Sequence, residues 1–390
     1  MNDAERPVRS AMLPYGRQWL DEADMRAVLE VLEGDWLTQG PKIEQFERKV
    51  AEIVGAKYAV AFCNGTAALH GACFAAGLGP GDEVITTPIT FLASANCALY
   101  VGARPVFADI RPDTYNIDPD RIEAAVTPRT KAVIPVDFAG QPAEMDRIMA
   151  IAEARGLTVI HDAAHSLGAS YAGRKVGTLG HMTMFSFHPV KPVTTGEGGV
   201  IVTDREDYYR KLLLFRTHGV TRDPAELETN EGPWYYEMHA LGYNYRMTDL
   251  QAALGISQLD KLERYNARRK AIAAAYDEAF ASIEGLITPH QHPLAQSSWH
   301  LYVLRWRTGP GMPDRKTVFA ALRAMNIGVN VHYIPIYRQP YYRRLGYTPE
   351  GCPEAERYYE TAISLPIFPR MTDDDVADVI RAVRRVFAKH

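Results

Sequence analysis

The chain has 390 residues, of which 47% are hydrophobic and 23% are charged, and its formal net charge is −4. A chain of this length and composition can bury a large core, so we expect one large domain and a smaller one. The 43 basic and 47 acidic residues nearly balance, which excludes the strongly basic surface of a general nucleic-acid-binding protein. A local basic cluster is interpreted as the solvated face of a helix; its members are Arg264, Arg268, Arg269 and Lys270.

The cysteines and the apolar runs exclude two further classes. The four cysteines do not have the spacing of metal ligands, and no metal site is expected. The first twelve residues lack the apolar segment of a secretory signal, and no apolar run is long enough to span a membrane. We therefore expect a cytoplasmic protein with no membrane partner.

Residues 1–55 are predicted to form an N-terminal arm with two helices. In the first, over 24–33, apolar residues recur at helical spacing from Met25 to Leu32. In the second, Pro41 stands at an early helical position, before an apolar pattern that starts at Ile43.

Residues 56–248 are predicted to form the large domain. Short apolar runs alternate there with helical patterns, which indicates a mostly parallel sheet with right-handed crossovers, an α/β fold. The candidate strands are 58–62, 83–87, 105–108, 132–136, 158–161, 183–186 and 200–203.

Residues 249–390 are predicted to form a linking helix and a small α+β domain. The long helical pattern begins after Asp249. It is followed by a strand near 299–306, a helix near 315–325, a strand near 328–332 and a final helix from Asp373.

An acid and a lysine are the most informative residues for function. One apolar run ends in His161-Asp162, and the next ends in SFHPVK, which carries Lys191. Parallel strands deliver both side chains to the same end of the sheet, where the sites of α/β proteins assemble. A carboxylate beside a reactive amine is typical of pyridoxal phosphate (PLP) enzymes, in which the acid keeps the pyridine nitrogen protonated. The alternatives are a helix N-cap for Asp162 and a solvated surface charge for Lys191.

A second motif has the form of a phosphate site. Asn64-Gly65-Thr66 follows the first predicted sheet strand and opens a helix over 67–76. Small residues at a helix N-terminus let backbone N–H groups approach an anion, and Thr66 adds a hydroxyl. By itself this turn is also compatible with an ordinary helix cap.

Several segments, in order along nearly the whole chain, resemble a known family. They are DWLTQGPKIEQFE, CNGTAALH, GDEVITTPITFLASAN, VDFAGQPAEMD, DAAHS with SFHPVKPVTTGEGG, LGYNYRMTDLQAALG and VNVHYIPIYRQPYY. They are similar to the DegT/DnrJ-type nucleotide-sugar aminotransferases, a branch of the fold-type I PLP enzymes. The resemblance implies a mostly parallel seven-stranded sheet in a large PLP-binding domain and a smaller α+β C-terminal domain.

The resemblance also implies roles for individual residues. Lys191 would be the catalytic residue that bonds to the cofactor, and Phe91 would stack on the pyridine face. Asn244 would reach the phosphate of the neighbouring subunit, so a homodimer with shared sites is expected. Phe91 and His165 are otherwise core residues, and Asn244 is otherwise a turn residue. The implied cofactor-binding set is Gly65, Thr66, Phe91, Asp162, His165, Ser186, Lys191 and Asn244.

The substrate-binding residues are implied by the resemblance alone. Trp36 and Tyr333 would stack on a base or sugar ring, and His332 would contact a phosphate. The implied set is Tyr15, Asp35, Trp36, Leu37, Thr38, Gly65, Ser186, Asn244, Val331, His332, Tyr333 and Ile334.

The reaction follows from the lysine. Relatives that dehydrate sugars have a histidine at this position, and this chain has Lys191. The expected reaction is transfer of an amino group from L-glutamate to the C4 keto group of a UDP-linked 4-keto-6-deoxy-N-acetylhexosamine, as in pseudaminic acid synthesis. The alternatives are a dTDP- or GDP-linked 3- or 4-ketosugar, an amino-acid PLP enzyme with Arg338 as its carboxylate clamp, and a non-catalytic regulator on the same scaffold.

Overall fold

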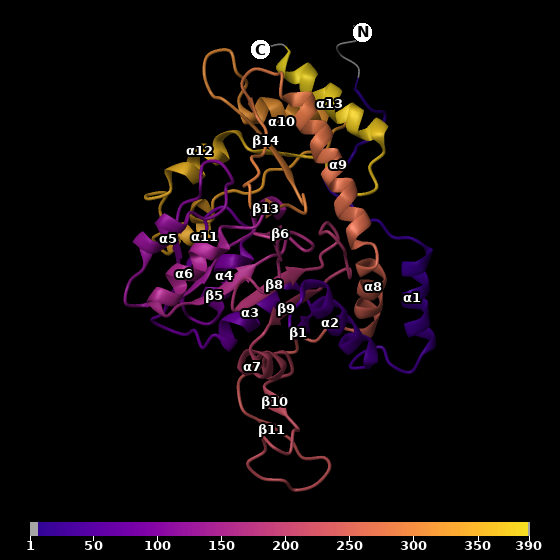
Figure 1. The fold of residues 1–390 in the computed structure, drawn as a ribbon, viewed down its shortest axis with the longest axis vertical. Coiled ribbons are helices and arrows are strands. Elements are labelled where there is room, and N and C mark those ends of the chain that lie inside the picture. Colours follow the sequence, from indigo (N-terminus) through magenta and orange to yellow (C-terminus); the bar gives the residue numbers. More distant parts are fainter. Residues whose placement is uncertain (1–6, 389–390) are drawn as a thin grey trace.

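A seven-stranded sheet forms the centre of the computed structural model, which describes residues 7–388 (Figure 1). Strand β9 runs antiparallel to both of its neighbours, and the other neighbouring pairs are parallel. The mostly parallel α/β fold expected from the sequence is confirmed, and each predicted strand overlaps one strand of this sheet. In spatial order the strands are β1 (Tyr58–Phe62), β9 (Gly199–Thr203), β8 (Met182–Ser186), β5 (Thr158–Asp162), β4 (Thr130–Ile134), β2 (Glu83–Thr86) and β3 (Arg104–Phe107).

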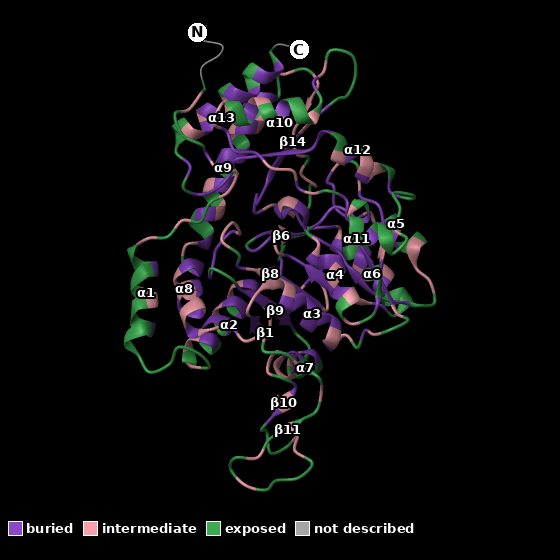
Figure 2. Cartoon of the chain, turned by 180° about the vertical axis from the view of Figure 1, so that it is seen from behind, coloured by how far each residue is buried: buried purple, intermediate pink, exposed green. Residues whose placement is uncertain are grey.

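Helices cover both faces of this sheet, which is why its strands are apolar on both sides. Alternate residues of β1 enter different cores: Val60 and Phe62 join one cluster, and Ala59 and Ala61 join the other. The first cluster contains α3 (Gly65–Ala75), α4 (Ala93–Tyr100) and α7 (Glu206–Arg216). The second contains α2 (Pro41–Val54), α5 (Pro119–Ala125), α6 (Met145–Arg155) and α8 (Asp249–Leu259). The sheet is therefore the buried layer of the molecule (Figure 2).

The C-terminal part packs around a separate hydrophobic cluster, at the top of Figure 1. Its antiparallel strands are β12 (Leu286–Ile287), β14 (Tyr302–Trp306) and β15 (Ile363–Leu365). They pack with α9 (Leu262–Phe280), α10 (Arg315–Ala324) and α13 (Asp373–Phe387). The predicted helices near 315–325 and from Asp373 match α10 and α13. The domain boundaries at 55 and 248 remain a prediction.

Short elements complete the chain within residues 7–388. They are the turns η2 (Phe138–Gly140) and η3 (Ile336–Arg338), the helices α11 (Pro340–Arg344) and α12 (Pro353–Thr361), and a small sheet of β13 (Ala295–Gln296), β6 (Ser170–Tyr171) and β7 (Arg174–Lys175). No helix of the described part of the chain is long and apolar enough to cross a membrane.

Two sequence expectations about the C-terminal part are wrong. Residues 328–332 form no strand: Asn330 makes one isolated bridge to Ser364. The Asn330 side chain accepts the N–H of Val331 at 2.8 Å, and such a local bond competes with a strand ladder. The long helix after Asp249 is in fact two, because α8 ends at Leu259 and α9 starts at Leu262.

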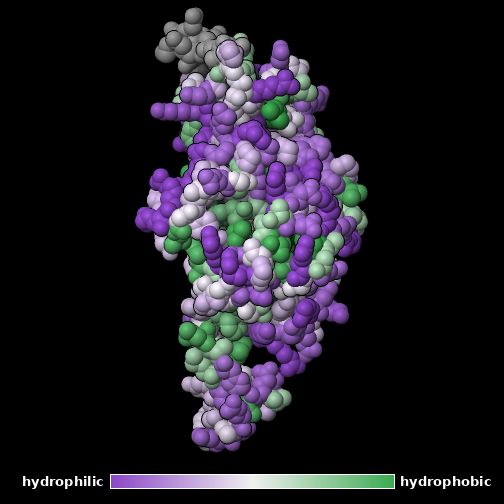
Figure 3. Space-filling view, turned by 90° about the vertical axis from the view of Figure 1, so that its left-hand side faces the viewer, coloured by the Kyte–Doolittle hydropathy of each residue, from purple (hydrophilic) through white to green (hydrophobic). Residues whose placement is uncertain are grey.

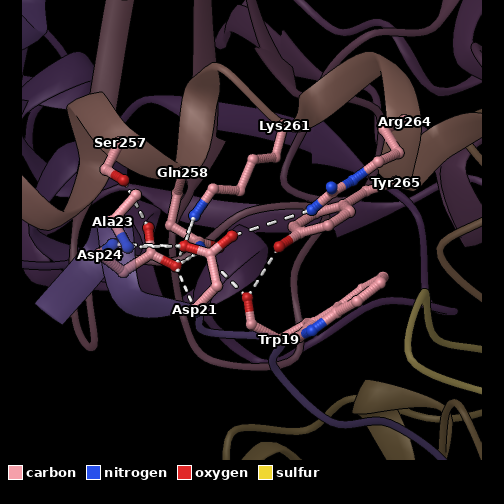
Figure 4. Close-up of polar contacts among 9 residues, drawn as sticks. All are labelled: Trp19, Asp21, Ala23, Asp24, Ser257, Gln258, Lys261, Arg264 and Tyr265. Atoms are coloured by element: carbon pink, nitrogen blue, oxygen red, sulfur yellow. Dashed lines mark hydrogen bonds and ion pairs between the residues drawn. The ribbon is translucent and has the colours of Figure 1, made fainter.

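The first helix, α1 (Glu22–Glu33), is attached largely by polar contacts (Figure 4), and Val31 is its one buried apolar residue. Asp24 is 1% exposed and accepts hydrogen bonds from Ser257 at 2.7 Å and Gln258 at 2.8 Å. Lys261 also forms an ion pair with the Asp24 carboxylate, at 2.7 Å. The expected apolar stripe instead faces solvent, since Met25, Leu29 and Leu32 are each more than half exposed.

A long hairpin projects from the body of the molecule, at the bottom of Figure 1. It is built on β10 (Val220–Thr221) and β11 (Glu237–Met238). Large apolar side chains are exposed along it, among them Trp234, Met238 and Leu241. Hydrophobic surface is also visible where the projection joins the body (Figure 3). Exposed apolar area of this kind is typical of a surface that another protein covers.

Candidate active site

A cavity of about 810 Å³ opens at the carboxyl ends of β5 and β8, beside the N-terminus of α3. This volume lies in the range of small-molecule sites. The cavity brings together most of the residues singled out in the sequence. They are Tyr15, Gly65, Thr66, Phe91, Asp162, His165, Ser186, Lys191, Val331, His332 and Tyr333.

Asp162 is the last residue of β5 and is 4% exposed. It accepts a hydrogen bond from the Ser94 hydroxyl at 2.7 Å and another from the Ala164 N–H at 3.1 Å. Burial raises the pKa of this carboxyl, against the lowering effects of these two donors and of Lys191. Turns rather than a helix follow Asp162, so it is not a helix N-cap. It is a buried acid supported by donors, suited to hold a cationic ring nitrogen.

Lys191 lies in the loop after β8, where its backbone N–H donates to the carbonyl of His188 at 2.9 Å. Its side chain is partly buried and lines the cavity. Burial lowers the pKa of the amine to about 8; the charge of Arg269 adds to this effect and Asp162 opposes it. Roughly a tenth of this amine is then uncharged at pH 7, against a negligible fraction for an ordinary lysine. An uncharged amine is the reactive form of a lysine.

The N-terminus of α3 forms an anion cradle with β8 and β9. The Asn64 side chain caps the helix by accepting the Ala67 N–H at 2.8 Å, and Gly65 and Thr66 follow at the cavity wall. A Cβ on Gly65 would lie 3.4 Å from the Cβ of Ser186. The backbone and the Ser186 hydroxyl therefore lie close together, as a phosphate group requires. With Asp162 and Lys191 in the same cavity, the donor set fits PLP.

Neutral imidazoles line another wall of the cavity. The rings of His165 and His300 lie 4.3 Å apart, and His165 Nε2 is 3.2 Å from the Tyr333 hydroxyl. Burial holds the pKa of His165 and of His300 well below the usual range, and lowers that of His332 to about 3. All three are uncharged at neutral pH, so this wall offers hydrogen bonds without net charge.

The sequence pattern did not predict every residue of this site. Ser94, His300 and Asn330 all line the cavity. Ser94 is the direct donor to Asp162, and its only sequence signal is its place three residues after Phe91. His300 comes just before β14, where a polar residue in an apolar run is the available signal.

Six predicted residues do not line the cavity of their own chain. Ile334 is 45% exposed, and Asn244 lies on the surface. The other four form the exposed stretch 35–38 after α1, in which Trp36 is 59% exposed. Thr38 forms a bridge with Thr248, four residues after Asn244, and Asn244 itself forms a bridge with Thr217.

The comparison with known families agrees with this geometry. The sequence pattern of the DegT/DnrJ/EryC1/StrS aminotransferase family matches residues 18–384. The chain belongs to this family. Aminotransferases of the DegT family depend on PLP, and the protein is accordingly an aminotransferase of the sugar-modifying type.

Individual family members match over almost the whole chain. The spore coat polysaccharide biosynthesis protein SpsC of Bacillus subtilis is 47% identical over 97% of this chain and 98% of its own length. The structure of Helicobacter pylori PseC, an aminotransferase involved in pseudaminic acid biosynthesis, has a TM-score of 0.90, with 33% identity over 97% of this chain and 100% of PseC. The putative sugar aminotransferase Spr1654 of Streptococcus pneumoniae, in its PLP form, has a TM-score of 0.90, with 31% identity over 97% of this chain and 99% of that one.

Proposed function

We propose that this protein is a PLP-dependent aminotransferase that moves an amino group from L-glutamate to a nucleotide-linked ketosugar. The observation that carries the proposal is the cavity that holds three features together. These are the partly neutral amine of Lys191, the buried carboxyl of Asp162 and the anion cradle at Gly65 and Thr66. The cavity volume of about 810 Å³ leaves room for a sugar beside the cofactor.

Each of these residues has a distinct task. PLP, when bound, would supply an electron sink for the reaction. Asp162, which accepts a hydrogen bond from Ser94, would pair with the protonated ring nitrogen of the cofactor. The Ser186 hydroxyl and the N-terminus of α3 bind the phosphate. The amine of Lys191 would bond to the cofactor aldehyde and, once released, would carry protons at the site. Phe91 and His165 confine the ring.

For the acceptor we propose a UDP-linked 4-keto-6-deoxy-N-acetylhexosamine, aminated at C4. The chain would then act as a UDP-4-amino-4,6-dideoxy-N-acetyl-β-L-altrosamine transaminase in pseudaminic acid synthesis. The likeness to PseC supports this choice. The higher identity to SpsC, a protein of spore coat polysaccharide synthesis, favours a second candidate, another dTDP- or GDP-linked 3- or 4-ketosugar.

Two activities of other classes receive less support. An enzyme that acts only on amino acids needs an arginine clamp, but Arg338 is paired with Glu356 and lies outside the cavity lining. A non-catalytic regulator would not need Lys191, Asp162 and Ser186 around one cavity.

We also propose that the working form is a cytoplasmic homodimer. The stretch 35–38 and Asn244 are exposed and do not line the cavity of their own chain. Contribution of both to the site of a second copy would account for this placement. The exposed apolar residues of the β10–β11 hairpin, such as Trp234, would be buried in such an interface.

The test is a two-step absorbance experiment on purified protein. The chain is loaded with PLP, L-glutamate is added to bleach the visible band, and separate samples receive UDP-, dTDP- and GDP-linked ketosugars. Return of the band with only the UDP-linked 4-keto-6-deoxy-N-acetylhexosamine is expected. Return with another ketosugar alone would retain the aminotransferase and refute the pathway. Absence of bleaching by L-glutamate would refute the proposed amino donor.

A further inference from the structure

Arg269, on α9, is buried although its sequence neighbours are solvated. The sequence interpretation of 264–270 as an exposed basic face holds for Arg264 and Lys270 and is wrong for Arg269, which is 1% exposed. Its guanidinium therefore enters the protein interior at the junction of α9 with the lysine loop. A buried arginine is rare unless it is paired.

Backbone carbonyls, rather than a carboxylate, surround the Arg269 guanidinium. Nη1 donates to the carbonyls of Ile367 at 2.8 Å and His300 at 3.2 Å, and Nη2 reaches that of Val190 at 3.5 Å. Within residues 7–388 the structure pairs it with no acidic side chain. Burial lowers the pKa of this group only to about 10, so it keeps its charge at neutral pH. An uncompensated buried charge costs stability, which calls for a functional reason.

The contacts of Arg269 lead directly to the active lysine. Val190 immediately precedes Lys191, and His300 places its ring in the cavity. Arg269 thus joins α9, the lysine loop and the segment before β14 at one point. Its positive charge also opposes protonation of the nearby Lys191 amine. The ionisable groups that line the two cavities adjoining this amine are Arg17, Tyr15, Tyr100, Asp162, His165, His188, Glu197, Tyr245, Tyr265, His300, His332 and Tyr333.

We propose that Arg269 is a positioning residue for Lys191: its guanidinium fixes the backbone of the lysine loop through the Val190 carbonyl and places a buried positive charge near the amine. This inference deepens the proposed function and rests on it. Asp162 favours the charged amine and the three histidines are neutral. Burial of the amine is the main influence that opposes Asp162, and the charge of Arg269 adds to it.

The test measures protonation of Lys191 without cofactor turnover. Apo protein is labelled with trace acetic anhydride from pH 6 to 11, and mass spectrometry quantifies the peptide that contains Lys191. In the unaltered chain the labelling midpoint is expected near pH 8. Arg269→Met should raise the midpoint, and labelling at pH 7 should fall with it, because a positive charge near the amine is removed. Arg269→Lys keeps the charge and should keep the midpoint, with slower PLP binding because the carbonyl contacts are lost.

Arg268→Met is the matched control, because Arg268 is on the same helix and bonds the carbonyl of Met371 instead. Its midpoint should remain that of the unaltered chain. An unshifted midpoint in Arg269→Met, or equal shifts in Arg269→Met and Arg268→Met, would overturn the proposal. If Arg269→Met does not fold, Arg269→Gln gives the same neutral test with one donor kept. A chain that never binds PLP would refute the proposed function and leave the labelling result valid.

Discussion

The substitution Ser94→Ala tests how much the Ser94 hydroxyl stabilises the buried carboxylate of Asp162. The variant removes the hydroxyl that donates to Asp162 Oδ2 at 2.7 Å, at a residue that is 1% exposed. A hydrogen bond to a charged buried group contributes about 1.5–3 kcal/mol. One pKa unit corresponds to about 1.4 kcal/mol of difference between the ionised and neutral forms. Because the neutral acid loses only about 1 kcal/mol, the pKa of Asp162 should rise by about half a unit to one and a half further units.

The effect of this change on stability depends on pH in a defined direction. The pKa of Asp162 in the folded protein already lies above its usual value of 3.8. The folded state therefore binds this proton more tightly than the unfolded state, and stability from this group falls as pH rises above 3.8. Ser94→Ala enlarges that loss, so at pH 7 the apo variant should be less stable by about 1.5–3 kcal/mol. As pH falls through the raised pKa, the difference should shrink to about 1 kcal/mol, the contribution of a neutral hydrogen bond.

Urea unfolding of the apo protein at pH 7 and at pH 4.5 to 5, at one protein concentration, measures both values. Thr90→Val is the control, since the Thr90 hydroxyl bonds Ser94 at 2.8 Å and not Asp162. Its destabilisation should be nearly the same at both pH values. A Ser94→Ala difference that does not change with pH would refute the view that Ser94 supports the ionised carboxylate.

Three further predictions concern the cofactor site. Lys191→Ala should abolish turnover and the visible band of bound PLP while circular dichroism stays native; near-normal transamination would contradict its catalytic role. Asn244→Ala should weaken PLP retention on gel filtration without altering sugar preference, and unchanged PLP affinity would count against a cross-subunit contact. Gly199→Ala would place a Cβ 2.5 Å from the carbonyl oxygen of Asn64, and this displacement of the cradle should lower PLP affinity in a spectroscopic titration by about tenfold. Gly79→Ala, where a Cβ meets open space, should leave that affinity unchanged.

Local sequence pattern was sufficient for the elements that are buried on both faces. The strands of the central sheet are continuous apolar runs, and the chemistry-bearing residues Asp162 and Lys191 stand where such runs end. The same reasoning was wrong for α1, whose apolar side does not pack against a hydrophobic core. The apolar stripe of α1 is exposed, since Asp24 and Lys261 attach the helix through its polar side.

For the cavity residues, too, the sequence contains no signal for contacts between residues that are far apart in the chain. Tyr333 and His165 were both predicted from the sequence as site residues. In the structure the Tyr333 hydroxyl lies 3.2 Å from His165 Nε2. Resemblance placed them in one site, but their contact has no local signature. The stretch 35–38 and Asn244 were assigned to the site by resemblance as well, and they lie outside the cavity of their own chain.

The sequence by itself determined the sheet, its polarity and the two residues at its carboxyl edge. These follow from the period of apolar residues and from the rule that parallel strands end together, both of which are local properties. The tertiary structure decided what surrounds those residues. Ser94 reaches Asp162 across 68 positions of sequence and Arg269 reaches Val190 across 79. Such contacts depend on how helices cross the sheet. The spacing of apolar residues in the sequence does not indicate which turn of a helix faces a given loop.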